Sequence, residues 1–434
     1  MTAAHAFRRR RAAGFILLAA AFMVAFFHRV APAALAEDLL RDLGAGAVAL
    51  GTLSAMYYYV YTAMQIPAGI LADRAGPRIG VAGGSLVAAA GTLLFAAAPG
   101  LLLANAGRFL VGLGVATAFV GLMKYNAEWF EARYYGLLSG MVVLLGNVGS
   151  VFGAGPLAQV LHWLSWRQAL AGIGLVSLVL AVLIWVFVRD RPAAAGFADT
   201  HPPRRGPRGA WWIELRDVAC NRHVWPHAVC LFTIIGGFFT FTGLWAVPYL
   251  GDVFGLGRQA ASNYVSLALL LFAVSGFAGG WLSDRIGRRK PVAVAAAAAT
   301  LAVWLATILL PWRPGPGAAL LFGLNGLAPS AMVVCYAAAK ESVAPHTAGM
   351  AIAFVNTGLF LGAALLQPAF GALLELAWDG TTRDGVPVYR AADYETGLWL
   401  LAAVAAVGLT AALAMRETYA GPLHPDTDDQ EAAT

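Results

Sequence analysis

The sequence predicts an all-α membrane protein with twelve transmembrane helices in two six-helix bundles. Of its 434 residues, 60% are hydrophobic and 12% are charged, whereas a soluble domain carries about 25% charged residues. The apolar residues form about twelve long runs, and ~20 apolar residues in a helix cross a hydrocarbon core ~30 Å thick. A charged turn that occurs twice, half a chain apart, indicates that the two bundles are copies of one unit.

The expected spans form two sets of six. Each span is an apolar run bounded by charged residues or by Gly- and Pro-containing turns, which end helices at a membrane surface. In the first half we expect spans at 12–36, 47–72, 79–97, 101–127, 135–162 and 167–188. In the second half we expect them at 224–250, 261–283, 291–311, 316–340, 347–376 and 391–415.

A polar stretch rich in Pro and Arg separates the two sets. Within it, Trp211, Trp212 and Leu215 fall at helical spacing beside charged residues, which is typical of a short amphipathic helix on a membrane surface. We therefore expect an N-terminal six-helix bundle at 1–188, a cytoplasmic linker with an amphipathic helix at 189–223, a C-terminal six-helix bundle at 224–416 and a disordered cytoplasmic tail at 417–434.

The basic residues predict the orientation of the chain. Of its 29 Lys and Arg residues, twenty fall in segments that share a side with the N-terminus, six fall on the other side and three lie within spans. Because basic residues concentrate on the cytoplasmic side, we expect a multi-pass protein of the cell inner membrane with both termini cytoplasmic. The same bias accounts for the net charge of +6 without a nucleic-acid partner.

The duplicated turn carries the internal symmetry. Its first copy is GILADRAGPR at 69–78 and its second is GWLSDRIGRR at 280–289, an offset of 284 − 73 = 211 residues. The glycines permit a tight turn, and an acidic residue near the start of the following helix is favoured by the helix dipole. A second pair supports the repeat, since Glu128 and Glu341 each precede a glycine by eight residues.

With these motifs the chain resembles a transporter of the major facilitator superfamily, closest in character to the organic-anion branches, the anion:cation symporters and sugar-phosphate-like transporters. The paired G-x-L-x-D-R-x-G-x-R turn is the strongest mark. The run Arg108-x-x-x-Gly112-x-Gly114 is a second one, and a Gly/Pro pattern from Gly149 to Pro156 is a loose third. The resemblance implies two bundles that rock about a central site and expose it to each side in turn.

The resemblance also implies that charges of the repeated turns pair with acids of neighbouring loops and latch the cytoplasmic gate. The alternative is that these charges serve only to orient the chain in the membrane. The residues expected at this gate are Asp73, Arg74, Arg78, Glu128, Arg133, Asp284, Arg285, Arg288 and Glu341.

Two arginines within spans are the first candidates for the substrate site. At ~1.5 Å per residue, Arg29 lies ~7–8 Å and Arg108 ~5 Å outward of the midplane. A charge inside a membrane normally faces a cavity, and a guanidinium binds carboxylate or phosphate in a bidentate manner. The two therefore predict an anionic substrate, as the resemblance also implies. The alternative for Arg108 is a hydrogen-bonding hub between spans.

Two further residues leave alternatives open. Lys124 lies ~24 Å below Arg108 along the axis, so it is either a second substrate contact or a lysine that reaches the membrane surface beside Glu128. His28 is the candidate for proton coupling, because histidine titrates near neutral pH, or else a hydrogen bonder in helix packing. The stretch after Arg108 lacks the acid that proton-coupled relatives carry there, so exchange of anions stays open.

Polar and aromatic residues complete the expected site. Tyr57, Tyr61 and Gln65 share one helix face and either line the cavity or pack between helices. Trp245, Asn147 and Asn356 are candidates for substrate contacts or for hydrogen bonds between helices.

The function that we expect is secondary active transport of a small organic anion, a carboxylate or a phosphorylated metabolite, by alternating access. Protons or a counter-anion would couple the movement, since no phosphate-binding loop for ATP is present in the sequence. The partners would be this substrate and the lipid bilayer, with no cofactor, no metal, no enzymatic activity and a monomeric chain. The alternatives are a proton-driven exporter of drugs or siderophore-like compounds and a membrane sensor built on a transporter scaffold.

Overall fold

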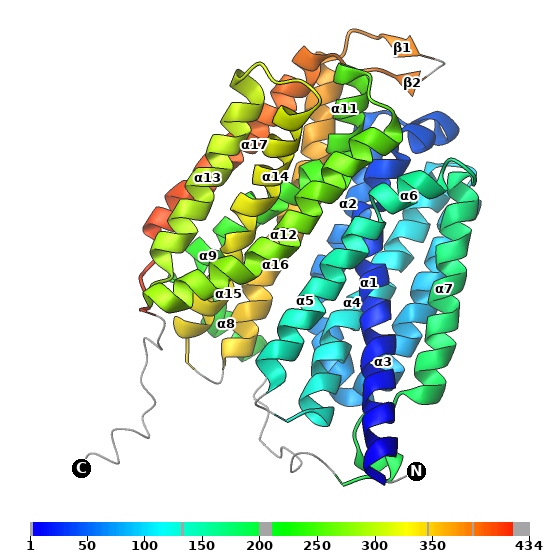
Figure 1. Cartoon of the computed structure of the whole chain (residues 1–434), viewed down its shortest axis with the longest axis vertical. Helices are drawn as coiled ribbons and strands as arrows, with labels where there is room; N and C mark the ends of the chain where they lie inside the picture. The colour runs from blue at the N-terminus through cyan, green and yellow to red at the C-terminus, as the bar shows by residue number, and fades with distance from the viewer. Residues whose placement is uncertain (1–2, 132–133, 199–210, 345–346, 384–385, 420–434) are drawn as a thin grey trace.

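The computed structural model describes residues 3–131, 134–198, 211–344, 347–383 and 386–419. Arg133, residues 199–210 of the expected linker and the tail from residue 420 onward lie outside the described residues, as does the side chain of Asp73. The chain forms two groups of long helices that stand side by side, and both termini lie at the same end (Figure 1). We call this end the termini side and the opposite end the far side.

The first half contains a helix for each of its six expected spans. The second expected span is divided at Met64. The first copy of the duplicated turn contains a reverse turn at Gly76, whose φ of 78° suits glycine. This turn separates the end of span two from the start of span three. The helices are α1 Ala3–Leu43, α2 Ala47–Ala63, α3 Gln65–Ala97, α4 Leu101–Trp129, α5 Tyr135–Phe152, α6 Gly155–Val160 and α7 Trp166–Phe187.

The second half repeats this plan after a 3-10 turn, η2 at Ala193–Ala195, and a short helix, α8 at Trp211–Cys220. The seventh span of the chain contains two π-helical segments, a rare feature that is frequent at functional sites. That span consists of α9 Trp225–Cys230, η3 Leu231–Ile235, α10 Gly236–Thr240, η4 Phe241–Trp245 and α11 Ala246–Phe254. The rest comprises α12 Arg258–Ile286, α13 Lys290–Leu309, α14 Pro316–Ser330, η5 Ala331–Val333, α15 Val334–Glu341, α16 Ala348–Ala377 and α17 Ala391–Ala414.

The predicted fold class is confirmed. Among the described residues, eleven helices are long and apolar enough to cross a membrane, and the twelfth expected span is the one divided at Met64. One small element was not predicted: β1 Thr382–Arg383 and β2 Val386–Pro387 form an antiparallel hairpin on the far side. The amphipathic helix expected in the linker is present as α8, with Trp211 and Trp212 exposed.

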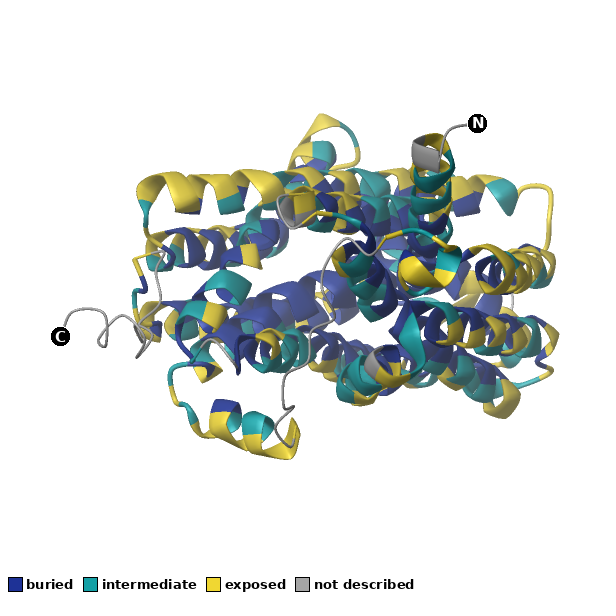
Figure 2. Ribbon diagram, turned by 90° about the horizontal axis from the view of Figure 1, so that it is seen from below, coloured by how far each residue is buried: buried dark blue, intermediate teal, exposed yellow. Residues whose placement is uncertain are grey.

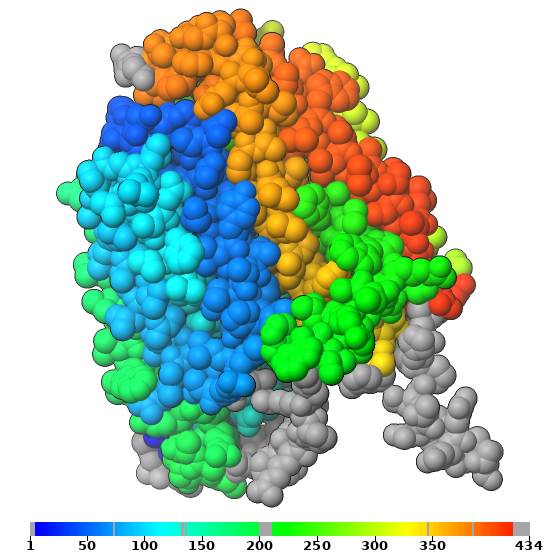
Figure 3. Space-filling model, turned by 180° about the vertical axis from the view of Figure 1, so that it is seen from behind, coloured from blue at the N-terminus to red at the C-terminus, as the bar shows by residue number. Residues whose placement is uncertain are grey.

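The two halves meet along α2 and α16, which run antiparallel with a constant register. Seen from behind, the segment of α2 lies beside that of α16 over most of its length (Figure 3). The ring centroids of Tyr61 and Phe360 are 4.3 Å apart. One turn along each helix, the Asn356 side-chain amide donates to the Gln65 amide oxygen over 3.1 Å. Viewed from the termini side, buried residues concentrate along the middle of the molecule (Figure 2).

Candidate functional site

Arg108 is a hydrogen-bonding hub between three helices. Its Nη1 donates to the carbonyl oxygen of His28 over 3.0 Å, and its Nη2 donates to that of Ser54 over 3.1 Å. Its Nε donates to the carbonyl of Leu53 over 3.3 Å. Gly112, one turn further along α4, permits this reach, because a Cβ there would lie 2.9 Å from the carbonyl oxygen of Tyr57. The guanidinium thus ties α4 to α1 and α2.

His28 lies next to this hub and is buried. Its Nε2 is 3.2 Å from the hydroxyl oxygen of Thr92. That hydroxyl donates its own proton to the carbonyl of Ala88 over 2.7 Å, so the histidine must be the donor in the first contact. The ring therefore carries its proton on Nε2 and links α1 to α3.

Arg29 occupies a different environment, a cage of three aromatic rings. Its guanidinium carbon lies 3.9 Å from the ring centroid of Phe26, 5.2 Å from that of Phe239 and 5.0 Å from that of Phe360. The arginine belongs to the first half, whereas Phe239 and Phe360 belong to the second half. Its side chain therefore lies at the junction between the halves.

The charge of Arg29 has no acidic partner among the described residues. The residue is 3% exposed, and within the described part of the chain its Nε lacks a hydrogen-bond partner. A buried charge without a partner is costly, so such groups are normally paired. Aromatic rings compensate a cation only in part. The cage therefore holds a guanidinium with hydrogen-bonding capacity left over.

Tyrosines of α2 support this cage from the first half. The Tyr57 hydroxyl donates to the carbonyl of Ala25 over 3.0 Å, and the Tyr58 hydroxyl donates to the carbonyl of Arg29 over 3.3 Å. The ring of Tyr61 stacks on that of Tyr57, with centroids 5.7 Å apart. Tyr57 and Tyr61, both predicted for the site, thus lie beside Arg29. The hydroxyl of Tyr57, however, is used to bind the backbone of α1.

A polar bridge crosses between the halves one turn closer to the termini side. The Tyr336 hydroxyl donates to the side-chain oxygen of Asn356 over 2.7 Å, and the Asn356 amide in turn donates to Gln65. All three residues are half-buried. The sequence prediction included Gln65 and Asn356 but missed Tyr336, for which a tyrosine in an otherwise apolar span was the only signal.

The other predicted substrate contacts donate hydrogen bonds to backbone carbonyls of the protein. The Trp245 indole donates to the carbonyl of Gln367 over 3.1 Å and is buried. The Asn147 amide returns to the carbonyl of Val143 on its own helix over 2.9 Å. The Lys124 ammonium donates to the carbonyl of Ala72 over 2.9 Å, which ties α4 to α3 near the duplicated turn.

The second copy of the duplicated turn forms an ionic network, centred on Arg289. Its Nη2 lies 2.8 Å from a Glu341 oxygen, and its Nη1 also pairs with Asp284. The hydrogen bond to Glu341 is the main cause that raises the pKa of the Arg289 guanidinium above its ordinary value. Asp284 and Glu341 were predicted at this gate, whereas Arg289 was not singled out from its basic run.

Its neighbours in the basic run point away from this network. Arg285 lies over the ring of Trp281 and Arg288 over that of Tyr419, and both arginines are exposed. The offset of 211 residues, which aligns Arg289 with Arg78, was a signal that could have selected Arg289.

The first copy of the turn makes a related contact. The backbone N–H of Arg78 donates to Asp190 over 2.8 Å, just as that of Arg289 donates to Glu417 over 2.7 Å. Each acid follows the last span of its own half. The Arg78 side chain donates to the carbonyl of Trp185 rather than to Glu128, within the described residues. Arg74 is exposed and Glu128 is half-buried.

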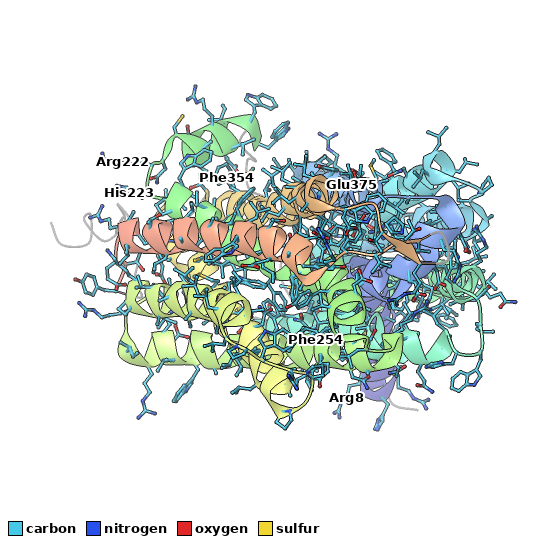
Figure 4. All side chains as sticks on the ribbon, turned by 90° about the horizontal axis from the view of Figure 1, so that it is seen from above. Arg8, Arg222, His223, Phe254, Phe354 and Glu375 are labelled. Atoms are coloured by element: carbon cyan, nitrogen blue, oxygen red, sulfur yellow. The ribbon has the colours of Figure 1, made fainter. Side chains whose placement is uncertain are left out.

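A cluster of charges joins the halves on the far side. Arg258, at the start of α12, lies 2.8 Å from Asp38 and 3.5 Å from Glu37, both on α1. A Glu375 oxygen accepts from the backbone N–H of Val48 over 2.8 Å, at the first turn of α2. Figure 4 looks onto this end and labels Glu375 and Phe254. Beside these contacts lies a cavity of about 290 Å³ lined by residues of both halves.

Comparisons with known proteins agree on the class of molecule. Residues 17–328 and 245–432 match the sequence model of the Major Facilitator Superfamily. Uncharacterized transporter YybO of Bacillus subtilis is 28% identical over 62% of this chain and 64% of its own length. Probable sulfoacetate transporter SauU of Cupriavidus necator is 23% identical over 82% of this chain and 85% of its own. A putative tartrate transporter of Agrobacterium vitis is 26% identical over 62% and 63%.

Solved structures show the same fold. A bacterial homolog of the human lysosomal transporter Spinster, in an inward-facing and unoccupied conformation, superposes with a TM-score of 0.75. The two are 17% identical, and the match covers 95% of this chain and 96% of the homolog. The D-xylose–proton symporter superposes with a TM-score of 0.70 at 15% identity, over 95% of this chain and 99% of the symporter.

Proposed function

This chain belongs to the Major Facilitator Superfamily, and from that premise we propose that it transports a small organic anion whose acidic group is held by Arg29. Members of this family are secondary transporters rather than enzymes, so the chain moves a small molecule across a membrane.

The observation that carries the proposal is the unpaired guanidinium of Arg29. It is buried between the halves, with no acidic side chain beside it among the described residues. A carboxylate or phosphate would supply both the missing charge and acceptors for its free N–H groups. The site thus favours an anion over a cation, and it argues against the export of cationic drugs.

Arg108 has a different role in this proposal. Three backbone carbonyls already occupy its guanidinium, so it positions the helix segment that carries Arg29 rather than binding the anion itself. One of those carbonyls belongs to His28, the residue just before Arg29 in the chain. Movement of Arg108 would therefore move Arg29.

The location of the site suits alternating access. Phe239 and Phe360 contact Arg29 from the opposite half, so a rocking motion of the halves would dismantle the cage on one side of the anion and rebuild it on the other. We place the far side outside the cell and the termini side in the cytoplasm, because the basic residues predominate near the termini. SauU and the putative tartrate transporter are named for sulfoacetate and tartrate, which are both organic anions. These names are consistent with this class of substrate.

Reconstituted protein tests the proposal. Binding of a panel of carboxylates and phosphate esters is measured by thermal shift, and uptake of those that bind is measured in proteoliposomes. We expect Arg29→Gln to abolish both binding and uptake. Arg167→Gln is the matched control, because Arg167 donates to carbonyls of Ala96 and Ala98 away from the cage. If Arg29→Gln transports normally, the proposal is wrong, and binding without uptake would instead fit a sensor.

A further inference from the structure

We infer that the substrate is a monocarboxylate whose acidic group is attached to a flat, apolar ring, rather than a hydroxylated diacid such as tartrate. This inference rests on the proposed function, because it assigns a substrate class to the same Arg29 site. Three observations support it. They are the number of guanidiniums with free donors, the aromatic rings around Arg29, and the hydrogen bonds that nearby hydroxyl and N–H groups already make within the protein.

The number of free guanidiniums sets the number of acidic groups. Arg29 and Arg108 lie at similar depth, but Arg108 spends each of its three nitrogens on a backbone carbonyl. Lys124 donates to Ala72 near the termini side, and on the far side Arg258 pairs with Asp38. Among the described residues, Arg29 is the central cation whose guanidinium keeps spare donors, which matches one carboxylate. A second carboxylate of a diacid would face the guanidinium of Arg108, whose three nitrogens already donate to carbonyls.

The rings around Arg29 set the character of the rest of the molecule. Phe26, Phe239 and Phe360 surround the guanidinium, and the cluster continues from Phe360 to Tyr61 at 4.3 Å and from Phe239 to Phe272 at 5.6 Å. An aromatic ring attached to the bound carboxylate would meet ring faces and edges at each of these positions. Such pairs attract beyond their buried area.

Several polar hydrogens near the cage are already committed. The hydroxyls of Tyr57 and Tyr58 donate to backbone carbonyls of α1. The Tyr336 hydroxyl donates to Asn356, and the Trp245 indole donates to the backbone of Gln367. Each hydroxyl of a sugar acid would lose its bonds to water on entering this site and would find few donors to replace them. A site of this kind rejects hydroxylated molecules that it cannot satisfy.

The inference is tested by comparing benzoate, benzamide and D-tartrate as probes of the purified full chain. Benzamide keeps the ring and removes the charge, and tartrate adds a second charge and hydroxyls to a chain without a ring. We expect benzoate to bind at least tenfold more tightly than tartrate, and benzamide to give no binding. Binding of benzoate must be lost in Arg29→Gln.

Variants of the cage separate the ring preference from the charge. Phe360→Leu and Phe239→Leu should each weaken benzoate binding by about fivefold or more and leave tartrate binding unchanged. The matched control is Phe322→Leu, a buried phenylalanine that contacts Phe241 and Tyr264 outside the cage. The melting temperature of each unliganded variant shows whether it folds, and two cage variants guard against the loss of one.

The possible results are distinguishable. If tartrate binds as tightly as benzoate, and both bind through Arg29, the inference fails while the proposed function stands. The inference also fails if the two cage variants bind benzoate as the wild type does. If no anion binds, or if binding ignores Arg29, the proposed function fails and the inference falls with it.

Discussion

The Nη1 atom of Arg258 lies 2.8 Å from the Oδ2 atom of Asp38 and joins the two halves on the far side. The other oxygen of the same carboxylate accepts from Arg41, also over 2.8 Å, within α1. Two more contacts lie nearby, since the backbone N–H of Gly155 donates to Ser266 over 2.9 Å and Gln259 donates to the carbonyl of Gly155 over 3.2 Å. The three contacts that cross between the halves link them on the far side, and we expect them to keep that side closed.

Breaking the contact between Arg258 and Asp38 should loosen this closure. The Asp38 side chain is 10% exposed, and loss of one partner of a buried polar contact costs about 1–3 kcal/mol. We expect Arg258→Gln to raise, by several-fold, the rate at which a maleimide labels Gly251→Cys in the far-side cavity. Cys220 is replaced by serine in this background because it is the exposed cysteine.

Arg41→Gln is the control for this measurement. It removes a bond to the same carboxylate, but one that does not cross between the halves. Residue 251 tolerates a side chain, since the nearest atom to a Cβ there is 3.7 Å away. Equal labelling in the Arg258→Gln and Arg41→Gln variants would show that the ion pair between the halves does not hold the far side closed.

The network on the termini side should depend on one arginine of its basic run. Arg289→Gln removes the bonds to Glu341 and Asp284, and it leaves the half-buried Glu341 carboxylate without its guanidinium. We expect a loss of about 1–3 kcal/mol, seen as a lower melting temperature in detergent. Arg288→Gln removes an equal charge from the exposed surface and should change stability by less than about 0.5 kcal/mol. Similar losses in both variants would contradict this account.

Substitution of the two intramembrane arginines should affect stability differently. Arg108→Met leaves three buried carbonyls of α1 and α2 without their donor, so we expect it to destabilise the empty protein by about 2 kcal/mol or more. Arg29→Met removes an unpaired buried charge and keeps an apolar side chain among the rings, a change that is often neutral or stabilising. We therefore expect an unchanged or higher melting temperature together with loss of anion binding. Destabilisation of equal size in both variants would mean that Arg29 is also a structural hub.

The helices and the repeat could be predicted from the sequence, because apolar runs and a recurring motif can be read from it directly. Arg29 could be chosen for the same reason, as a charge within an apolar run. Its cage could not be predicted, since Phe239 and Phe360 are more than two hundred residues away along the chain and resemble any other phenylalanine of a span. The partners of Arg108 could not be predicted either, because they are backbone carbonyls that residue identity does not encode. Asp38 was passed over as an ordinary acid at a helix end.

His28 was predicted as a candidate for proton coupling, and its hydrogen bonds favour a packing role. Its Nε2–H donates to Thr92, and its backbone carbonyl accepts from Arg108. A second proton would place another positive charge beside the buried Arg108, without an acid nearby among the described residues. We expect His28→Gln, which keeps a donor toward Thr92, to preserve uptake and its dependence on pH. Uptake in proteoliposomes with and without a pH gradient checks this, and loss of the pH response alone would return His28 to the coupling role.

The unpaired charge of Arg29 should also make exchange faster than net transport. To return empty, the carrier must pass through a state closed on both sides with the Arg29 guanidinium buried and uncompensated, whereas a bound carboxylate neutralises it. Several kcal/mol of difference are typical for a buried charge with and without its partner, and each 1.4 kcal/mol in a barrier changes a rate about tenfold. We therefore expect proteoliposomes preloaded with benzoate to take up labelled benzoate at least tenfold faster than empty ones. An ionophore that collapses the membrane potential serves as the control, because it removes any back-voltage that could slow net uptake. Equal initial rates in loaded and empty vesicles would show that the empty carrier returns freely and that Arg29 finds another partner on the way.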